Sequence, residues 1–99
     1  MKKFEICFTK EAESQLLDLE LDKSKKNIYK AVAKTIGLMQ VDLRHPSLKT
    51  HEYTTLSRER GYKVFESYAQ NNTPSAYRVF WYYGSQKNEI TIVAIVPHP

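Results

Sequence analysis

The sequence has little cysteine, glycine and proline, and it lacks a long apolar run. Cys7 is its single cysteine, so no disulfide can form within the chain, and a disulfide-stapled or zinc-ribbon fold is excluded. Three glycines and four prolines exclude collagen-like and Pro/Gly-rich low-complexity chains. No apolar run approaches the roughly 20 residues that a membrane-spanning helix needs. We therefore expect no membrane partner and a reducing compartment.

What is present is the composition of a small folded domain. Of 99 residues, 41% are hydrophobic and 26% are charged, as is typical of globular chains. Domains commonly contain roughly 50 to 250 residues, and no repeat or linker-like tract divides this sequence. We expect a single domain over residues 1–99 with one modest core.

Charge is unevenly distributed along the chain. Fifteen lysines and arginines against eleven acidic residues give a net charge of +4. Residues 1–22 carry a net charge of −3, whereas residues 23–99 carry +7. Such an excess on part of a small domain favours a polyanionic partner such as nucleic acid. An ordinary solvated basic surface explains the same charges, so charge alone does not decide between the two.

Hydrophobic periodicity predicts a strand followed by two helices. Residues 3–9 alternate between apolar and polar side chains, as a strand does. Thr9 is a suitable N-cap for a helix that reaches about Leu21, and residues 22–24 interrupt the helical spacing. A second apolar stripe at helical spacing runs over residues 25–40. These two amphipathic segments predict a helical hairpin.

The second half of the chain predicts a long loop and three strands. Residues 41–60 contain Pro46 and show no sustained period, so we expect a loop there; long loops in small domains are commonly functional. Aromatic and β-branched runs separated by turn residues predict strands at 62–69, 76–83 and 90–96. The expected fold is α+β: an N-terminal strand, a helical hairpin and a three-stranded antiparallel meander, forming one sheet with the helices on one of its faces.

Five short motifs carry a resemblance to a known family. They are FTKEA at residues 8–12, LKTHE at 48–52, GYKVFE at 61–66, AYRVFW at 76–81 and IVPH at 95–98. Each motif alone is weakly or moderately specific, but together they occur in order along nearly the whole chain. In that order the chain resembles the RelE/ParE superfamily, the toxin half of type II toxin–antitoxin pairs.

The resemblance implies a cytoplasmic toxin that a cognate antitoxin neutralises. Many members are metal-independent endoribonucleases that cut messenger RNA, often on the ribosome, and so inhibit translation. Other branches poison DNA gyrase without cutting RNA, and a degenerate member would only bind its antitoxin; fold similarity alone does not choose among these activities. The expected antitoxin is a short acidic chain that wraps the helical hairpin or the strand face. A heterotetramer of toxin and antitoxin is one possible assembly, and the sequence does not set it.

Metal-free RNA cleavage needs three chemical contributions. The 2′-hydroxyl must lose a proton, the charge at phosphorus must be stabilised, and the leaving 5′-oxygen must gain a proton. The products are a 2′,3′-cyclic phosphate and a 5′-hydroxyl end. Arg78, the arginine of the family's tyrosine–arginine strand motif, is the candidate phosphate clamp, because a guanidinium grips two phosphate oxygens at once. Arg78 could equally pair with Glu66 on a neighbouring strand, and the two roles are compatible.

His98 and Glu66 are the candidate proton-transfer groups. His98 matches the histidine near the end of the chain that protonates the leaving oxygen in several cleaving members, and an imidazole exchanges protons near neutral pH. The alternative for His98 is a frayed terminal residue without a role. Glu66 matches the carboxylate that serves as base toward the 2′-hydroxyl in some relatives. The alternative for Glu66 is plain cross-strand support.

Lys63 is a further catalytic candidate with a mixed match. It corresponds to the first of two lysines that other relatives use, but Phe65 occupies the second of those positions. That departure counts against a lysine-driven mechanism and favours a variant that uses glutamate, arginine and histidine. Strand alternation also places Lys63 and Glu66 on opposite faces of a sheet.

The long loop supplies candidate RNA-binding residues. Its basic side chains suit phosphate contacts, which give affinity without sequence preference, although a solvated loop has the same composition; they are Lys49, His51, Arg58 and Arg60. The aromatic residues of 76–83 can stack on bases or pack in the core, which is their commoner use.

No cofactor or metal site is expected. His45, His51 and His98 lack the spacing of metal ligands. Cys7 lies on an apolar strand, where we expect it to be buried and inert.

Overall fold

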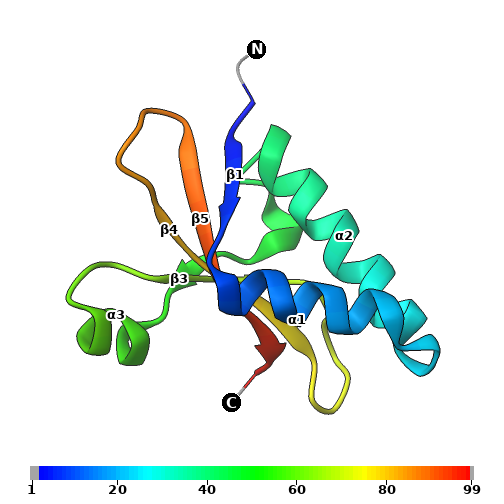
Figure 1. Ribbon diagram of the computed structural model, residues 1–99. Coiled ribbons are helices and arrows are strands. Elements are labelled where there is room, and N and C mark those ends of the chain that lie inside the picture. Colours follow the sequence, from blue (N-terminus) through cyan, green and yellow to red (C-terminus); the bar gives the residue numbers. More distant parts are fainter. Residues whose placement is uncertain (1–2, 99) are drawn as a thin grey trace.

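The computed structural model describes residues 3–98 and has an α+β architecture, which confirms the expected fold class. A five-stranded mixed sheet crosses the molecule, with the two long helices together on one side of it (Figure 1). In chain order, the elements are β1 (Glu5–Phe8), α1 (Lys10–Leu21), the short 3₁₀ turn η1 (Lys23–Lys25), α2 (Lys26–Val41), the 3₁₀ turn η2 (Pro46–Leu48), β2 (His51–Glu52), α3 (Thr54–Arg60), β3 (Phe65–Tyr68), β4 (Tyr77–Tyr83) and β5 (Glu89–Pro97).

The strands lie in the order β1-β5-β4-β3-β2. β1 pairs in parallel with β5, and the other neighbours are antiparallel, so β3, β4 and β5 form the expected meander. The register sets Glu66 on β3 opposite Phe80 on β4 and opposite His51 on β2. Arg78 lies opposite Tyr68, two positions from Glu66. Side chains from three strands are thereby brought side by side on one face of the sheet.

The helical hairpin begins and turns at side-chain caps. Thr9 precedes α1, and its Oγ1 accepts a hydrogen bond from the Ala12 backbone N–H at 3.1 Å, as the sequence predicts for an N-cap. Asp22 ends α1 and accepts hydrogen bonds from the Ser24 hydroxyl and backbone N–H, which lower the pKa of the Asp22 carboxyl.

Among residues 3–98, none of the helices combines the length and the apolar character of a membrane-spanning segment.

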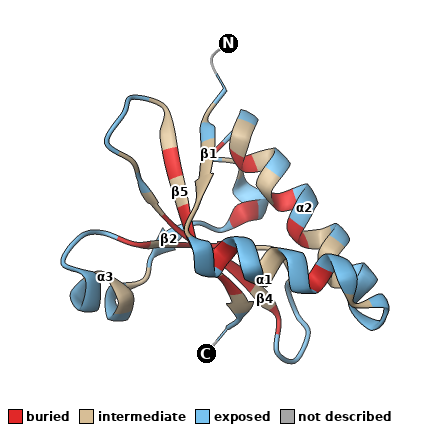
Figure 2. Cartoon of the chain, viewed as in Figure 1, coloured by how far each residue is buried: buried red, intermediate tan, exposed pale blue. Residues whose placement is uncertain are grey.

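The main core lies between this hairpin and one face of the sheet. Val32 and Met39 of α2 are fully buried against Trp81 of β4 and Ile92 of β5. Buried residues recur at intervals along α1 and α2 and are frequent in the central strands β4 and β5 (Figure 2). The indole N–H of Trp81 donates to the Ser67 hydroxyl at 2.8 Å, so the largest core side chain has its polar atom satisfied. The hairpin therefore covers the Trp81 face of the sheet.

The prediction of a loop over residues 41–60 is wrong in part, because this segment also contains β2 and α3. The seven residues of α3 include one apolar side chain, Leu56, so no helical period is visible in the sequence. Leu56 packs against a small second core of Val64, Phe80 and Val93. This core lies on the sheet face opposite the hairpin, so the expectation that the helices lie on one face only is also wrong.

The strand predicted over 62–69 is shorter in the structure and begins at Phe65. The Val64 backbone N–H donates to the Ser57 hydroxyl of α3 at 2.8 Å. Residues 61–64 are thereby attached to α3, which ends at Gly61 with a positive φ of 77°. The other two predicted strands agree with β4 and β5 to within a residue at either end.

Candidate active site

Glu66 is the centre of a polar cluster on the face opposite the hairpin. Its side chain is fully buried, although a carboxylate is among the least often buried groups and is costly to bury unless it is paired. It lies opposite Phe80, which belongs to the second core. A buried carboxylate in this position requires compensation from neighbouring donors.

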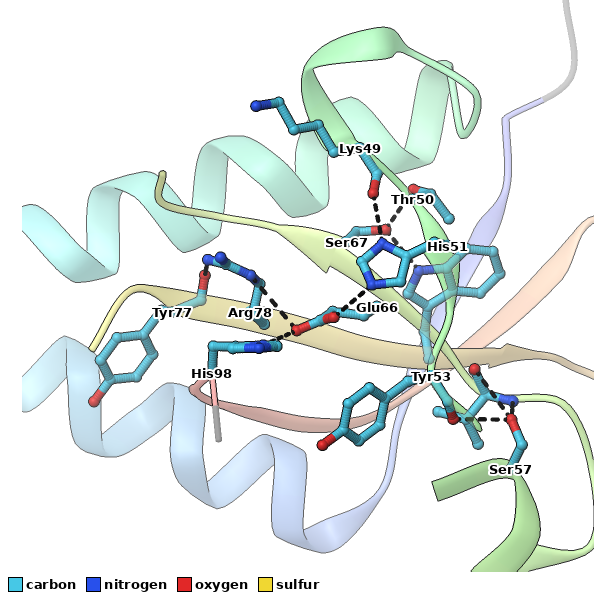
Figure 3. A network of polar contacts seen from close by, with 12 residues as sticks. Lys49, Thr50, His51, Tyr53, Ser57, Glu66, Ser67, Tyr77, Arg78 and His98 are labelled. Carbon is cyan, nitrogen blue, oxygen red and sulfur yellow. Dashed lines mark hydrogen bonds and ion pairs between the residues drawn. The ribbon is translucent and has the colours of Figure 1, made fainter. Parts of the chain in front are cut away.

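Three potential cations from three elements surround that carboxylate (Figure 3). His51 of β2 has its Nε2 2.8 Å from Oε1 of Glu66. His98, which follows β5, has its Nδ1 2.5 Å from Oε2. Arg78 of β4 has its Nε 3.5 Å from the same Oε2. Residues far apart in the sequence therefore converge on one oxygen pair.

His98 is held in place and keeps one ring nitrogen available. Its backbone N–H donates to the Ala76 carbonyl at 2.8 Å, which ties the tail to the start of β4. Because a carboxylate accepts hydrogen bonds, the contact with Glu66 assigns the ring proton to Nδ1 and leaves Nε2 for a ligand. The side chain is 45% exposed. A carboxylate behind one nitrogen and an open second nitrogen is the arrangement of a histidine acid or base.

His51 is oriented differently, because both of its nitrogens are occupied. Nδ1 lies 3.0 Å from the Lys49 carbonyl, which only accepts, so Nδ1 carries a proton. Nε2 lies 2.8 Å from Glu66 Oε1, so the half-exposed ring of His51 covers that oxygen.

Arg78 is rigidly fixed. Its guanidinium carbon lies 3.6 Å from the centroid of the Tyr68 ring, and its Nη1 donates to the carbonyls of Gln70 at 2.6 Å and Tyr77 at 3.2 Å. The residue is 7% exposed. The cross-strand pairing of Arg78 with Glu66 that the sequence allowed is thus present, and it pre-orients a planar cation at the rim of the cluster.

Two buried polar atoms of the cluster have no hydrogen-bond partner among the residues described. Within residues 3–98, Glu66 Oε1 and Arg78 Nε are buried without a hydrogen-bond partner, since the His51 and Glu66 contacts at these atoms are close but not well aligned. A buried polar atom without a partner costs about 1–3 kcal/mol. Such atoms in a native fold call for an explanation, such as an ordered water, a bound ion or a catalytic role.

The remaining sequence candidates lie at varying distances from this cluster. Lys49 belongs to its rim, because its Nζ lies 5.7 Å from the Tyr68 ring centroid. Lys63 and Arg58 line a separate shallow hollow beside α3, and Arg60 lines another between α3 and the end of β5. The structure therefore brings together Glu66, Arg78, His98, His51 and Lys49, and it places the other three candidates elsewhere.

Sequence reasoning missed the ring of Tyr68 and treated His51 only as an RNA-contacting residue. The alternation of β3 puts Tyr68 on the same face as Glu66, which was a usable signal. The pairing of His51 with Glu66 had no such signal, because β2 has two residues and no apolar pattern.

Cys7 and metal binding offer no further chemistry in the described chain. Cys7 is half-buried on β1, and burial together with the carboxylates of Glu89 and Glu5 raises the pKa of its thiol, so the reactive thiolate is disfavoured. In residues 3–98, no group of three or more His, Cys, Asp or Glu side chains is arranged to hold a metal ion.

No protein-family model matches the chain, and no curated protein matches its sequence. The resemblance to RelE/ParE toxins therefore depends on the motifs of the chain itself, and function has to be inferred from the cluster around Glu66.

Proposed function

We propose that this chain is a RelE/ParE-like toxin of a type II toxin–antitoxin pair that cuts messenger RNA without a metal ion and so inhibits translation in the cytoplasm. The observation that carries the proposal is the convergence of His98 and Arg78 on the buried carboxylate of Glu66. A proton-transfer imidazole, a fixed guanidinium and a carboxylate are the groups that cleavage by a 2′-hydroxyl requires. The order of strand, helical hairpin and antiparallel meander fits the same family.

Each group takes one step of the reaction. Arg78 binds the scissile phosphate and stabilises the charge that develops at phosphorus. Glu66 accepts the proton of the 2′-hydroxyl through Oε1, the 2′-oxygen bonds to phosphorus, and the bond from phosphorus to the 5′-oxygen breaks. His98 acts as an imidazolium: it keeps the Nδ1 proton toward Glu66 and donates its Nε2 proton to that 5′-oxygen, which leaves a neutral ring. Because Oε1 is covered by the half-exposed His51, that ring moves aside when RNA enters.

The proposed antitoxin has a suitable surface on the helical hairpin. Leu17 and Leu21 of α1 are 50% and 71% exposed, although large apolar side chains are costly to leave in water. A short antitoxin segment with apolar side chains would cover them. We further propose the ribosome as the site of action, because the positive charge of residues 23–99 suits a polyanionic environment.

New RNA ends test the proposed activity. Addition of the purified protein to a cell-free translation system is expected to stop protein synthesis and to create new 5′ ends within the translated message, detected by primer extension. The matched control is the His98→Asn variant, which is expected to create no such ends. Arrest of translation without new 5′ ends would instead support a toxin that binds its target without cutting it.

A further inference from the structure

A further hollow, of about 340 Å³, lies on the other face of the sheet from Glu66. It lies between the segment 43–50 and the adjoining ends of β3 and β4 and is open to solvent. Its walls combine basic and aromatic side chains, namely Arg44, His45, Lys49, Phe65, Trp81 and Tyr83. Pockets for small ligands commonly begin at about 300 Å³. This combination is typical of sites that hold single-stranded nucleic acid, where cations contact phosphate and aromatic rings stack on bases.

The aromatic wall offers one open ring. Phe65 and Trp81 stack with centroids 4.9 Å apart, and Tyr83 packs edge-on against them at 5.6 and 5.1 Å. Trp81 is 1% exposed, whereas Tyr83 is 54% exposed. Two inner rings thus fix the orientation of an exposed tyrosine, and a base can stack on it with little loss of side-chain freedom.

The opposite wall presents hydrogen-bond donors. The Ser47 backbone N–H donates to Nδ1 of His45 at 3.1 Å, so this nitrogen holds a lone pair and Nε2 carries the proton. Arg44 is exposed and its guanidinium has donors only. The side-chain nitrogens of Arg44 and the Nε2 of His45 can therefore donate hydrogen bonds to the oxygens of a phosphate.

The hollow and the Glu66 cluster share one short segment of chain. The carbonyl of Lys49 accepts from His51 in the cluster. The next residue, Thr50, lines the hollow and hydrogen-bonds at 2.7 Å to Ser67, which in turn accepts from Trp81. Because β2 is the edge strand of the sheet, a chain that crosses this edge reaches both sites.

We propose that this hollow binds one nucleotide of single-stranded RNA close in sequence to the cleaved bond, with its base on Tyr83 and its phosphate on Arg44 and His45. The proposal rests on the proposed function for its choice of RNA. It adds a binding site that holds the strand beyond the cleaved bond, on the far side of β2.

Binding of an uncleavable strand tests this site separately from catalysis. The probe is a short oligonucleotide with 2′-O-methyl groups at every position, which lacks the attacking hydroxyl. Trp81 is the single tryptophan of the chain, so its fluorescence reports on the hollow. Tyr83→Ala is expected to weaken binding by about 5- to 150-fold, the effect of losing one stacked base, and Tyr83→Phe to bind like the unchanged protein.

The control is Tyr62→Ala, which removes an exposed tyrosine (41%) outside the hollow and is expected to leave affinity unchanged. Arg44→Ala is expected to reduce the salt dependence of binding by about 0.7 in the logarithmic slope, the contribution of one single-strand phosphate contact. Equal affinity of Tyr83→Ala and the unchanged protein would overturn the proposal, as would an equal loss for Tyr62→Ala. If the protein binds this probe through Tyr83 but creates no new RNA ends, the proposed binding site is supported and the proposed cleavage is contradicted.

Discussion

His98→Ala is expected to slow RNA cleavage by about 10²- to 10⁴-fold, the usual contribution of one acid or base group. The physical reason is that Nε2 of His98 is the nitrogen left open by the contact of Nδ1 with Glu66. The rate is to be measured under single-turnover conditions in a translation system, so that product release does not mask the chemical step.

His98→Asn separates the proposed proton transfer by His98 from its hydrogen bond to the Glu66 carboxylate. The amide can still donate to the Glu66 carboxylate, but it has no nitrogen that exchanges protons near neutral pH. The asparagine variant is therefore expected to fold like the unchanged protein and to be as slow as the alanine variant. Cleavage by His98→Asn at the unchanged rate would contradict the assignment of His98 as the acid.

Arg78→Ala is expected to lower both stability and activity. It leaves the fully buried Glu66 carboxylate without its nearest permanent cation, and breaking a buried ion pair costs about 3–5 kcal/mol of unfolding free energy. Loss of the donor to the phosphate is expected to reduce the cleavage rate by about 10²- to 10³-fold. Urea unfolding and single-turnover cleavage measure the two effects separately.

Arg78→Lys distinguishes the clamp from the ion pair. A lysine keeps the charge near Glu66, so most of the stability should remain, but it lacks the planar fork that grips two oxygens. Cleavage by Arg78→Lys is expected to be at least about tenfold slower than cleavage by the unchanged protein. Arg58→Lys, an exposed site away from the cluster, is the matched control and should change neither measurement. Unchanged cleavage by Arg78→Lys would show that the guanidinium does not bind the phosphate.

Much of the fold follows from local signals in the sequence. Thr9 is both the expected and the observed helix cap, and the apolar stripes of α1 and α2 pack as their spacing predicts. The pairing of Arg78 with Glu66 was also foreseeable, because two strands that follow one another along the chain usually pair. Local capping and periodicity are sufficient for these features.

The other features of the fold and of the site depend on contacts between distant segments, and no local sequence pattern indicates those contacts. α3 is stabilised through Leu56 against Val64 and Phe80, not through its own period. The approach of His51 to Glu66 requires the pairing of β2 with β3, which two residues cannot specify. The full burial of Glu66 results from His51, His98 and Arg78 closing over it. The sequence therefore identifies candidate site residues one at a time, and tertiary packing brings them together.

The chemistry of the new RNA ends is the most direct measurement of the central claim that Glu66, Arg78 and His98 cut RNA through its own 2′-hydroxyl. The account predicts 5′-hydroxyl ends, which ligate to an adaptor only after phosphorylation by a kinase, and 2′,3′-cyclic phosphates on the matching fragments. Both kinds of end should be absent with His98→Asn. Fragments with 5′-phosphate ends, or the same ends produced by His98→Asn, would contradict the account.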